Sequence, residues 1–123
     1  MIVGVGIDMI EVDRVMEKVG RNNGFKEKVF SKSEIEFCDS NRKSENYAAR
    51  FAAKEAFLKA TGLGLLLGND LSQIEIISDV NGKPSINLTG EFKQQADKNG
   101  WTKIHVSLSH LQQVACAVVI IER

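Results

Sequence analysis

Residues 47–60 of the chain read YAARFAAKEAFLKA, a stretch that is apolar on almost every side of a helical wheel. A helix of this kind is usually buried at the centre of a domain. Ser44 has the side chain of a helix N-cap, and Gly62 can end a helix in the left-handed conformation. We therefore predict a central helix from about Glu45 to Thr61, against which the rest of the chain packs.

Glu55 stands in the middle of one apolar face of this helix, and Lys59 follows one turn later. The other residues of that face are Ala48, Phe51, Ala52 and Leu58. A buried carboxylate is costly unless it is paired or binds a cation. Glu55 is therefore either half of an ordinary surface pair with Lys59, worth about 0.3–0.5 kcal/mol, or a cation ligand. The helical pattern alone leaves both interpretations open.

The N-terminal residues predict a strand with an acid at its end. Residues 2–7 are rich in β-branched residues and glycine, which favours a strand that ends at Asp8. Asp8 has two interpretations. It caps a helix that begins near Ile10, or it joins Glu55 in holding a hard divalent ion such as magnesium, which binds carboxylate oxygens and keeps other positions for water and phosphates.

From Ile10 to Arg21 the apolar residues recur with a helical period. One face consists of Val12, Val15, Met16 and Val19. The nearly opposite face carries three basic residues that we call the basic ridge, Arg14, Lys18 and Arg21. The ridge is either a solvated helix face or a docking strip for an acidic partner, in which case its charges chiefly raise the association rate.

The remaining segments predict further helices and strands. Ser31 and Glu34 have capping-box spacing and open a short helix through Cys38, and the glycine- and leucine-rich residues 62–70 predict a loop that closes over a ligand. Turn signals and periodicity predict strands at 74–77, 85–88, 104–109 and 114–121, and a helix at 89–99. Residues 114–121 are apolar at nearly every position, which predicts burial on both faces. We therefore predict a single α+β domain over residues 1–123.

The composition of the chain limits the partners and the cellular locations that are expected for it. The 123 residues include 16 basic and 16 acidic side chains, so no overall basic field recommends nucleic acid or a membrane surface as the partner. Cys38 and Cys116 match no metal-ligand spacing and are too few for a disulfide framework, so we expect buried or unreactive thiols. The N-terminus has no basic leader, and the longest apolar run, 114–121, is too short to span a membrane. These features predict a cytoplasmic protein.

Four segments, in order along the chain, resemble those of the holo-acyl-carrier-protein synthases, members of the 4′-phosphopantetheinyl transferase superfamily. Residues 6–14, GIDMIEVDR, are similar to the N-terminal signature of this family, and residues 50–60, RFAAKEAFLKA, to its second and most specific signature. Residues 81–84, NGKP, and 107–110, SLSH, fall where the family has similar segments. The resemblance therefore covers essentially the whole chain.

The resemblance implies the short, single-domain form of the 4′-phosphopantetheinyl transferase fold, with mostly antiparallel strands and a long central helix, assembled as a homotrimer with active sites between subunits. It implies a magnesium-dependent enzyme that moves the 4′-phosphopantetheine arm of coenzyme A onto a serine of an acyl carrier protein, in support of fatty acid biosynthesis. Acyl carrier proteins are acidic and helical. This favours the docking interpretation of the basic ridge, above all for Arg14, which lies in the first signature.

Carried over position by position, the resemblance assigns roles to individual residues. Asp8 and Glu55 match the magnesium ligands, and Lys59 matches the lysine that meets the phosphates of coenzyme A. The positions close to bound coenzyme A are matched by Arg50, Lys83, Pro84 and His110. Two departures stand out. Ile10 occupies the position of a third acid in larger, two-domain relatives, so that water fills that coordination position, and residues 111–113 are less polar than is usual for the family.

The expected reaction needs no nucleophile on the enzyme, because the serine hydroxyl attacks phosphorus and adenosine 3′,5′-bisphosphate leaves. Magnesium and the ammonium of Lys59 are suited to stabilise the charge that builds on the phosphoryl oxygens. The base that takes the serine proton is open: Glu55 acting directly or through water, a water molecule on the metal, and His110 all qualify. The same groups also suit the alternative function, a non-catalytic, metal-dependent nucleotide-binding module.

Overall fold

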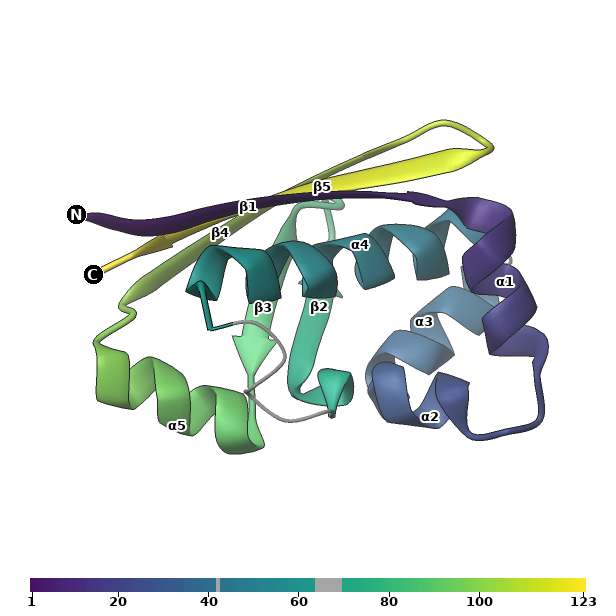
Figure 1. Cartoon of the computed structure of the whole chain (residues 1–123). Coiled ribbons are helices and arrows are strands. Elements are labelled where there is room, and N and C mark those ends of the chain that lie inside the picture. Colours follow the sequence, from purple (N-terminus) through teal and green to yellow (C-terminus); the bar gives the residue numbers. More distant parts are fainter. Residues whose placement is uncertain (42, 64–69) are drawn as a thin grey trace.

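Three strands form the sheet on which the molecule is built. In the computed structural model, which describes residues 1–41, 43–63 and 70–123, β1 (Ile2–Glu11), β5 (Val114–Glu122) and β4 (Lys103–His110) pair in the antiparallel order β1-β5-β4. The central helix α4 (Ser44–Thr61) lies along one face of this sheet (Figure 1). The N-terminal amine donates to the carbonyl oxygen of Arg123 at 3.0 Å, so the two termini lie side by side.

Glycines in β1 allow α4 to lie close to the sheet. A Cβ atom on Gly6 would lie 1.9 Å from the carbonyl oxygen of Ala56, and one on Gly4 would lie 1.8 Å from that of Ala60. The helix contributes small side chains to the same interior, since Ala52, Ala53, Ala56 and Ala60 are all buried. Residues 47–60 therefore lie at the centre of the fold, as predicted.

The boundaries of α4 confirm one predicted signal and correct another. Gly62 ends the helix in the left-handed conformation with φ of 71°, as predicted. Ser44, however, is the first residue of the helix rather than its cap. The N-cap is Lys43, which makes no side-chain capping hydrogen bond. The first turns are held by packing instead, because Tyr47 and Ala48 are buried.

The helices α1 (Val12–Gly20), α2 (Phe25–Val29) and α3 (Lys32–Asn41) gather at one end of the molecule (Figure 1). The predicted capping box forms at the start of α3. The N–H of Ser31 donates to Glu34 Oε1 at 2.9 Å, and the N–H of Glu34 donates to Ser31 Oγ at 3.2 Å. The five-residue helix α2 is not predicted, because it is a little over one turn long and begins after Gly24 without a side-chain cap.

The prediction that β1 ends at Asp8 is wrong, because the strand continues to Glu11. The pairing with β5 runs on from Asp8 opposite Ala117 to Glu11 opposite Val114. The N-cap of α1 is Glu11. Asp8 therefore lies within the sheet, and its interpretation as a helix cap is excluded.

The two strands predicted at 74–77 and 85–88 form a hairpin of β2 (Ile74–Ser78) and β3 (Pro84–Leu88), which pair antiparallel with each other as a two-stranded sheet. The short 3₁₀ helix η2 (Leu71–Gln73) leads into β2. The helix α5 (Gly90–Asn99) follows β3 and ends at Gly100 in the left-handed conformation, as predicted. The predicted loop at 62–70 falls largely on residues 64–69, which lie outside the described residues.

The prediction that residues 114–121 are buried on both faces is wrong for the single chain. The side chains of β5 alternate: Ala115, Ala117, Val119 and Ile121 are buried on the α4 side, and those between them are half-buried on the other side. The outward residues of β1 are more exposed, at 38% to 68%: Val3, Val5, Ile7 and Met9. Together these outward residues form an apolar surface that we call the outer sheet face.

Two smaller expectations concern the thiols and the membrane. Cys38 is buried and Cys116 is half-buried, and both are free. Burial raises the pKa of the Cys38 thiol to about 11, so this thiol is unreactive at neutral pH, as expected. Across the described ranges, no helix has both the length and the apolar character that crossing a membrane requires.

Candidate active site

The structure brings Asp8, Glu55 and Lys59 together where β1 meets α4. Asp8 faces the helix, on the same side of β1 as Gly4 and Gly6, and its side chain is 16% exposed. The ammonium of Lys59 donates to Asp8 Oδ1 at 3.0 Å and to the carbonyl oxygen of Ile7 at 3.0 Å. Lys59 therefore pairs across two elements with Asp8, rather than forming the local surface pair with Glu55 that the helical spacing allows.

Glu55 is half-buried beside this ion pair, and its carboxylate is destabilised there. Burial raises the pKa of Glu55, and the negative charge of Asp8 raises it further. The ammonium groups of Lys59 and Lys18 act in the opposite direction. Because the charge of Asp8 acts on Glu55, the two carboxylates lie close enough to repel each other.

This cluster has the donor set of a site for a hard divalent cation. Two carboxylates that repel each other are stabilised by a cation between them, and oxygen ligands are those that magnesium prefers. Within the described residues, no third acid, histidine or cysteine completes a larger ligand group. The expectation that water takes the position held by an acid in larger, two-domain relatives stays a prediction.

A pocket of about 450 Å³ lies on another side of α4. It is lined by α3, α4, the hairpin and the end of β4, through Phe37, Asn46, Ala49, Arg50, Ser78, Asp79, Val80, Gly82, Pro84, Leu108 and His110. The resemblance places three of these residues close to coenzyme A, namely Arg50, Pro84 and His110. The structure therefore brings these three together around one cavity, although they come from three distant segments.

Arg50 is the arginine among the residues that line this pocket. It is 3% exposed, and its guanidinium carbon lies 4.2 Å from the ring centroid of Phe37. Its terminal nitrogen Nη2 donates to Ser78 Oγ at 3.3 Å, whereas its Nε is buried and has no hydrogen-bond partner among the described residues. A buried donor without a partner is unusual in a folded protein and suits an acceptor supplied by a ligand.

The turn of the hairpin borders the same pocket. Asp79 Oδ1 accepts from the N–H groups of Asn81 at 2.8 Å and Lys83 at 2.9 Å, and Gly82 adopts φ of 83°. The exposed side chain of Lys83 does not line the pocket, although its neighbours Gly82 and Pro84 do. Asp79 shapes this turn and was missed by sequence reasoning, although an aspartate two residues before Asn-Gly is a recognisable turn signal.

Phe37, Asn46 and Ser78 are also pocket residues that sequence reasoning missed. No local pattern marks them, because they meet only when α3, α4 and the hairpin pack together. Phe37 is 39% exposed, and its ring lies against the Arg50 guanidinium.

The two groups of predicted site residues lie on different sides of α4. At 100° per residue, Arg50 and Glu55 are about 140° apart on the helix, and Arg50 and Lys59 are about 180° apart. The pocket lining includes none of Asp8, Glu55 and Lys59. Likewise, β1 and β4 lie on opposite sides of β5 in the sheet. One chain therefore carries Asp8, Glu55 and Lys59, which we call the acidic cluster, near the β1 edge of the sheet, and the pocket around Arg50 near its β4 edge.

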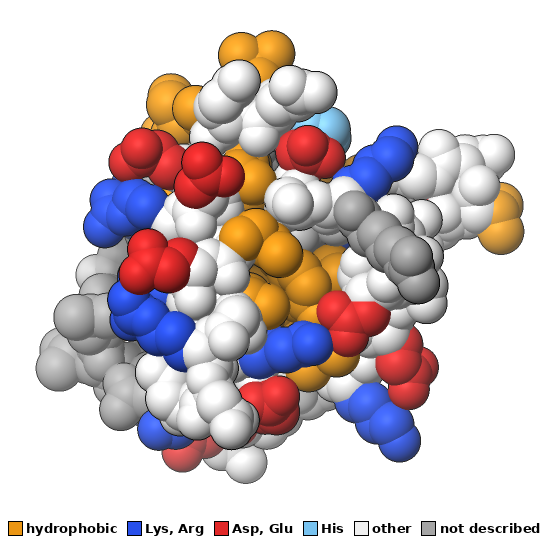
Figure 2. All heavy atoms as spheres, turned by 90° about the vertical axis from the view of Figure 1, so that its right-hand side faces the viewer, with side chains coloured by type: hydrophobic (Ala, Val, Ile, Leu, Met, Phe, Trp, Pro, Cys, Tyr) orange, Lys and Arg blue, Asp and Glu red, His pale blue; other side chains and the backbone are white. Residues whose placement is uncertain are grey.

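The basic ridge is less uniform than predicted. Arg14 Nη1 lies 3.8 Å from Glu11 Oε1, and Arg21 Nη2 lies 2.6 Å from Glu17 Oε1. Both pairs are on the exposed surface. Acidic and basic side chains accordingly stand close together at this end of the molecule, around a hydrophobic centre (Figure 2). Lys18 is half-buried, and its ammonium lies 5.9 Å and 6.0 Å from the ring centroids of Phe25 and Phe51. Lys18 therefore faces α4, apart from the two exposed arginines.

Residues 4–119 match the family model of the 4′-phosphopantetheinyl transferase superfamily. The chain is 44% identical to the holo-acyl-carrier-protein synthase of Syntrophus aciditrophicus, over 99% of this chain and 97% of that protein. It is 46% identical to the synthase of Ruminiclostridium cellulolyticum, over 95% of this chain and 90% of that protein. These relatives match nearly the full length of the chain.

Solved structures of synthases have the same fold. The holo-acyl-carrier-protein synthase of Neisseria meningitidis superposes with a TM-score of 0.89 at 28% identity and covers 100% of both chains. That of Helicobacter pylori, in complex with coenzyme A, superposes with a TM-score of 0.83 at 32% identity, over 96% of this chain and 99% of that chain. The chain therefore belongs to the 4′-phosphopantetheinyl transferase superfamily, among the holo-acyl-carrier-protein synthases.

Proposed function

We propose that the protein transfers the 4′-phosphopantetheine arm of coenzyme A to a serine of an apo-acyl carrier protein, with adenosine 3′,5′-bisphosphate as the second product. The observation that carries this proposal is the cluster of Asp8, Glu55 and Lys59, formed by both family signatures at the contact of β1 with α4. The resemblance to the family implies that this reaction serves fatty acid biosynthesis in the cytoplasm.

Asp8 and Glu55 are the residues that hold magnesium. When bound, magnesium supplies positive charge that stabilises the developing charge on the phosphoryl oxygens. Lys59 contributes in the same way through its own ammonium. Its side chain is 57% exposed, so a phosphate can reach it without displacing any part of the fold. Positioning of the two reacting oxygens about phosphorus contributes the rest of the acceleration.

The pocket at Arg50 binds the nucleotide end of coenzyme A. The guanidinium of Arg50, which lines the pocket, suits phosphate oxygens, and the apolar side chains of Val80 and Leu108 suit the base. Lys83, exposed on the turn that borders the pocket, suits phosphates that project from it. His110 lies in this pocket, whereas Glu55 lies in the acidic cluster. His110→Ala separates two roles: a rise in KM for coenzyme A with unchanged kcat marks a ligand contact, and a fall in kcat marks the base.

The complete site forms between copies of the chain in a homotrimer. Because the acidic cluster and the pocket lie on opposite edges of one chain, a site that uses both needs a second copy. The outer sheet face is the surface on which copies meet, since a soluble protein rarely leaves several neighbouring apolar side chains exposed. Repetition of one heterologous contact closes such an assembly into a ring.

Mass spectrometry of an apo-acyl carrier protein tests the proposed reaction. Incubation with the enzyme, coenzyme A and magnesium is expected to add one phosphopantetheine to one serine and to release adenosine 3′,5′-bisphosphate. The alternative, a non-catalytic nucleotide-binding module, requires that coenzyme A binds and the carrier mass stays unchanged. No transfer to a panel of apo-carrier proteins, with coenzyme A bound, would favour this alternative.

A further inference from the structure

Lys54 is a buried charge that the proposed chemistry does not use. Its side chain is fully buried, on the turn of α4 between Arg50 and Leu58. Burial lowers the pKa of Lys54, and the charge of Glu34 opposes that shift. A buried ammonium is tolerated only where partners satisfy its charge and its donors. The partners of Lys54 therefore indicate what this residue is for.

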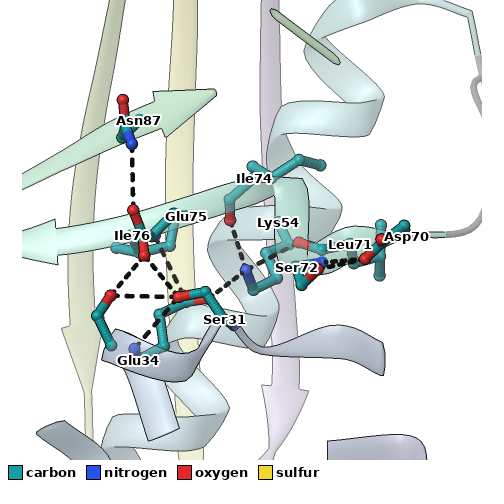
Figure 3. A network of polar contacts seen from close by, with 11 residues as sticks. Ser31, Glu34, Lys54, Asp70, Leu71, Ser72, Ile74, Glu75, Ile76 and Asn87 are labelled. Carbon is teal, nitrogen blue, oxygen red and sulfur yellow. Dashed lines mark hydrogen bonds and ion pairs between the residues drawn. The ribbon is translucent and has the colours of Figure 1, made fainter. Parts of the chain in front are cut away.

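All three donors of the Lys54 ammonium are used. They bond to Glu34 Oε1 at 2.8 Å, to the carbonyl oxygen of Leu71 at 3.0 Å and to that of Ile74 (Figure 3). Lys54 thus joins α4 to α3, to η2 and to the first residue of β2.

Glu34 completes the junction from the other side. Its Oε1 also accepts from the N–H of Ser31 at 2.9 Å, and its Oε2 accepts from the N–H of Ile76 at 3.1 Å. Next to it, Glu75 accepts from Ser31 Oγ at 2.6 Å and from Asn87 Nδ2 at 3.1 Å (Figure 3). The Glu34–Lys54 pair therefore fixes the position of β2 along its length relative to α3 and α4.

This position determines the geometry of the pocket. Ile76 is two residues before Ser78, whose hydroxyl meets Arg50, and Lys54 is one helical turn after Arg50 on the same side of α4. Within the described residues, β2 and β3 form a sheet separate from the three-stranded one. A hairpin on its own is marginally stable. Side-chain contacts therefore decide where the hairpin sits against α4.

We propose that the Glu34–Lys54 pair is a positioning device for coenzyme A: it holds the β2–β3 hairpin against α4 in the place where Ser78, Asp79 and Pro84 complete the pocket around Arg50. This inference rests on the proposed function for the identity of the ligand. Both residues act through the hairpin, and neither touches the reacting atoms.

Glu34→Gln tests the proposal, because it keeps the shape of the side chain and removes the charge that faces Lys54. We expect KM for coenzyme A to rise about tenfold or more, with kcat at saturating coenzyme A and KM for the carrier protein nearly unchanged. Hydrogen exchange at the Ile76 amide is expected to speed up. The control is Lys93→Met with Asp97→Asn, which removes an exposed ion pair of 2.7 Å on α5 and is expected to change none of these values.

Glu34→Gln leaves an uncompensated ammonium in the interior and therefore carries a risk of misfolding. The double variant Glu34→Gln with Lys54→Met leaves no unpaired charge, and it is expected to fold and to show the same selective rise in KM. A folded variant with unchanged KM for coenzyme A and unchanged exchange at Ile76 would overturn the proposal. Equal losses for both substrates would also overturn it, since they indicate general destabilisation.

Calorimetry of coenzyme A binding separates this inference from the proposed function. A wild-type protein that binds coenzyme A and transfers nothing contradicts the proposed function alone, and the dissociation constant of Glu34→Gln still tests the pair. If the wild-type protein transfers the arm and a folded Glu34→Gln variant has an unchanged dissociation constant for coenzyme A, only the positioning role of the Glu34–Lys54 pair is contradicted.

Discussion

Glu55 is unfavourable for the stability of the fold but has a side chain that suits a cation. Its carboxylate is half-buried on the central helix and lies close to the like charge of Asp8, and both raise its pKa. Stability alone would favour a neutral residue at this position. A group that is retained against stability is a candidate for function. The proposed binding of a cation together with Asp8 gives Glu55 such a function.

Glu55→Gln keeps the size of the side chain and removes its charge. We expect kcat to fall by about 100-fold or more, because a magnesium ligand is lost, and part of the activity to return at high magnesium. The thermal midpoint is expected to stay the same or to rise, because the repulsion with Asp8 is gone. The matched control is Glu91→Gln, on the exposed surface of α5. Full activity at low magnesium would show that Glu55 is not a ligand.

Gly6 is required by the close contact of β1 with α4. A Cβ atom there would lie 1.9 Å from the carbonyl oxygen of Ala56 and 2.7 Å from the nitrogen of Ala60, and backbone atoms of a helix cannot move aside locally. We expect Gly6→Ala to reduce the free energy of unfolding by about 1–3 kcal/mol in a urea titration. Gly20→Ala is the control, since nothing lies within 4 Å of its Cβ position. Equal stability of Gly6→Ala and the wild type would contradict the packing described here.

At the scale of single residues, the sequence predicts the acidic cluster better than the pocket. Asp8, Glu55 and Lys59 stand out because a charge next to a buried element requires an explanation. No feature of the sequence distinguishes Phe37, Ser78 and Asp79, since an exposed aromatic, a serine and a turn aspartate are common on any surface. They become a pocket only through the packing of three elements around Arg50.

Helix ends were predictable where a local signal decides them. The capping box at Ser31 and Glu34 and the left-handed glycines Gly62 and Gly100 act within one turn, so their chemistry is readable from the sequence. The end of β1 is decided instead by its partner. Residues 9–11 suit either a strand or the start of a helix, and pairing with β5 extends the strand.

The helix α1 was predicted in outline, but the role of its basic residues changes with the structure. Lys18 faces α4 and lies near Glu55, whose pKa its charge lowers, so only Arg14 and Arg21 remain exposed along the ridge. Arg14 pairs with Glu11 at the end of β1 and Arg21 pairs with Glu17 of α1, and exposed pairs of this kind contribute little to stability. Both arginines remain available to an acidic partner.

Reversal of Arg14 and Arg21 to Glu tests the docking role of α1. We expect KM for the acyl carrier protein to rise about tenfold, KM for coenzyme A to stay nearly unchanged, and carrier binding by the wild type to weaken with salt. Lys93→Glu with Lys98→Glu changes the net charge equally on α5 and serves as control. Equal carrier affinity of both double variants across a salt series would identify the ridge as a solvated helix face.

The whole molecule has two features that a single chain leaves unexplained. One is the outer sheet face, which exposes Val5 and Ile7 at 59% each and Met9 at 68%. The other is the separation of the acidic cluster from the pocket across α4. The apolar run at 114–121 predicted burial on both faces, and the single chain buries only one. The proposed assembly of copies through the outer sheet face would account for both features together.

Val5→Glu places a charge on the outer sheet face without touching α4. We expect it to yield a folded monomer in sedimentation velocity, where the wild type is expected to sediment as a trimer, and to abolish transfer. Ile77→Glu is the control, because Ile77 is exposed at 42% on the separate hairpin sheet. A fully active monomer, of either the variant or the wild type, would overturn the shared-site arrangement.

Complementation between two inactive variants tests whether two copies of the chain share one transferase site. Asp8→Asn removes the acidic cluster, and Arg50→Gln removes the charge of the pocket. Each variant alone is expected to transfer almost no phosphopantetheine to an apo-acyl carrier protein, as measured by mass spectrometry. Co-expressed in equal amounts, they assemble mixed trimers in which about a quarter of the sites combine two intact halves, so about a quarter of the wild-type activity is expected. Mixed trimers that transfer no more than the separate variants would contradict the account.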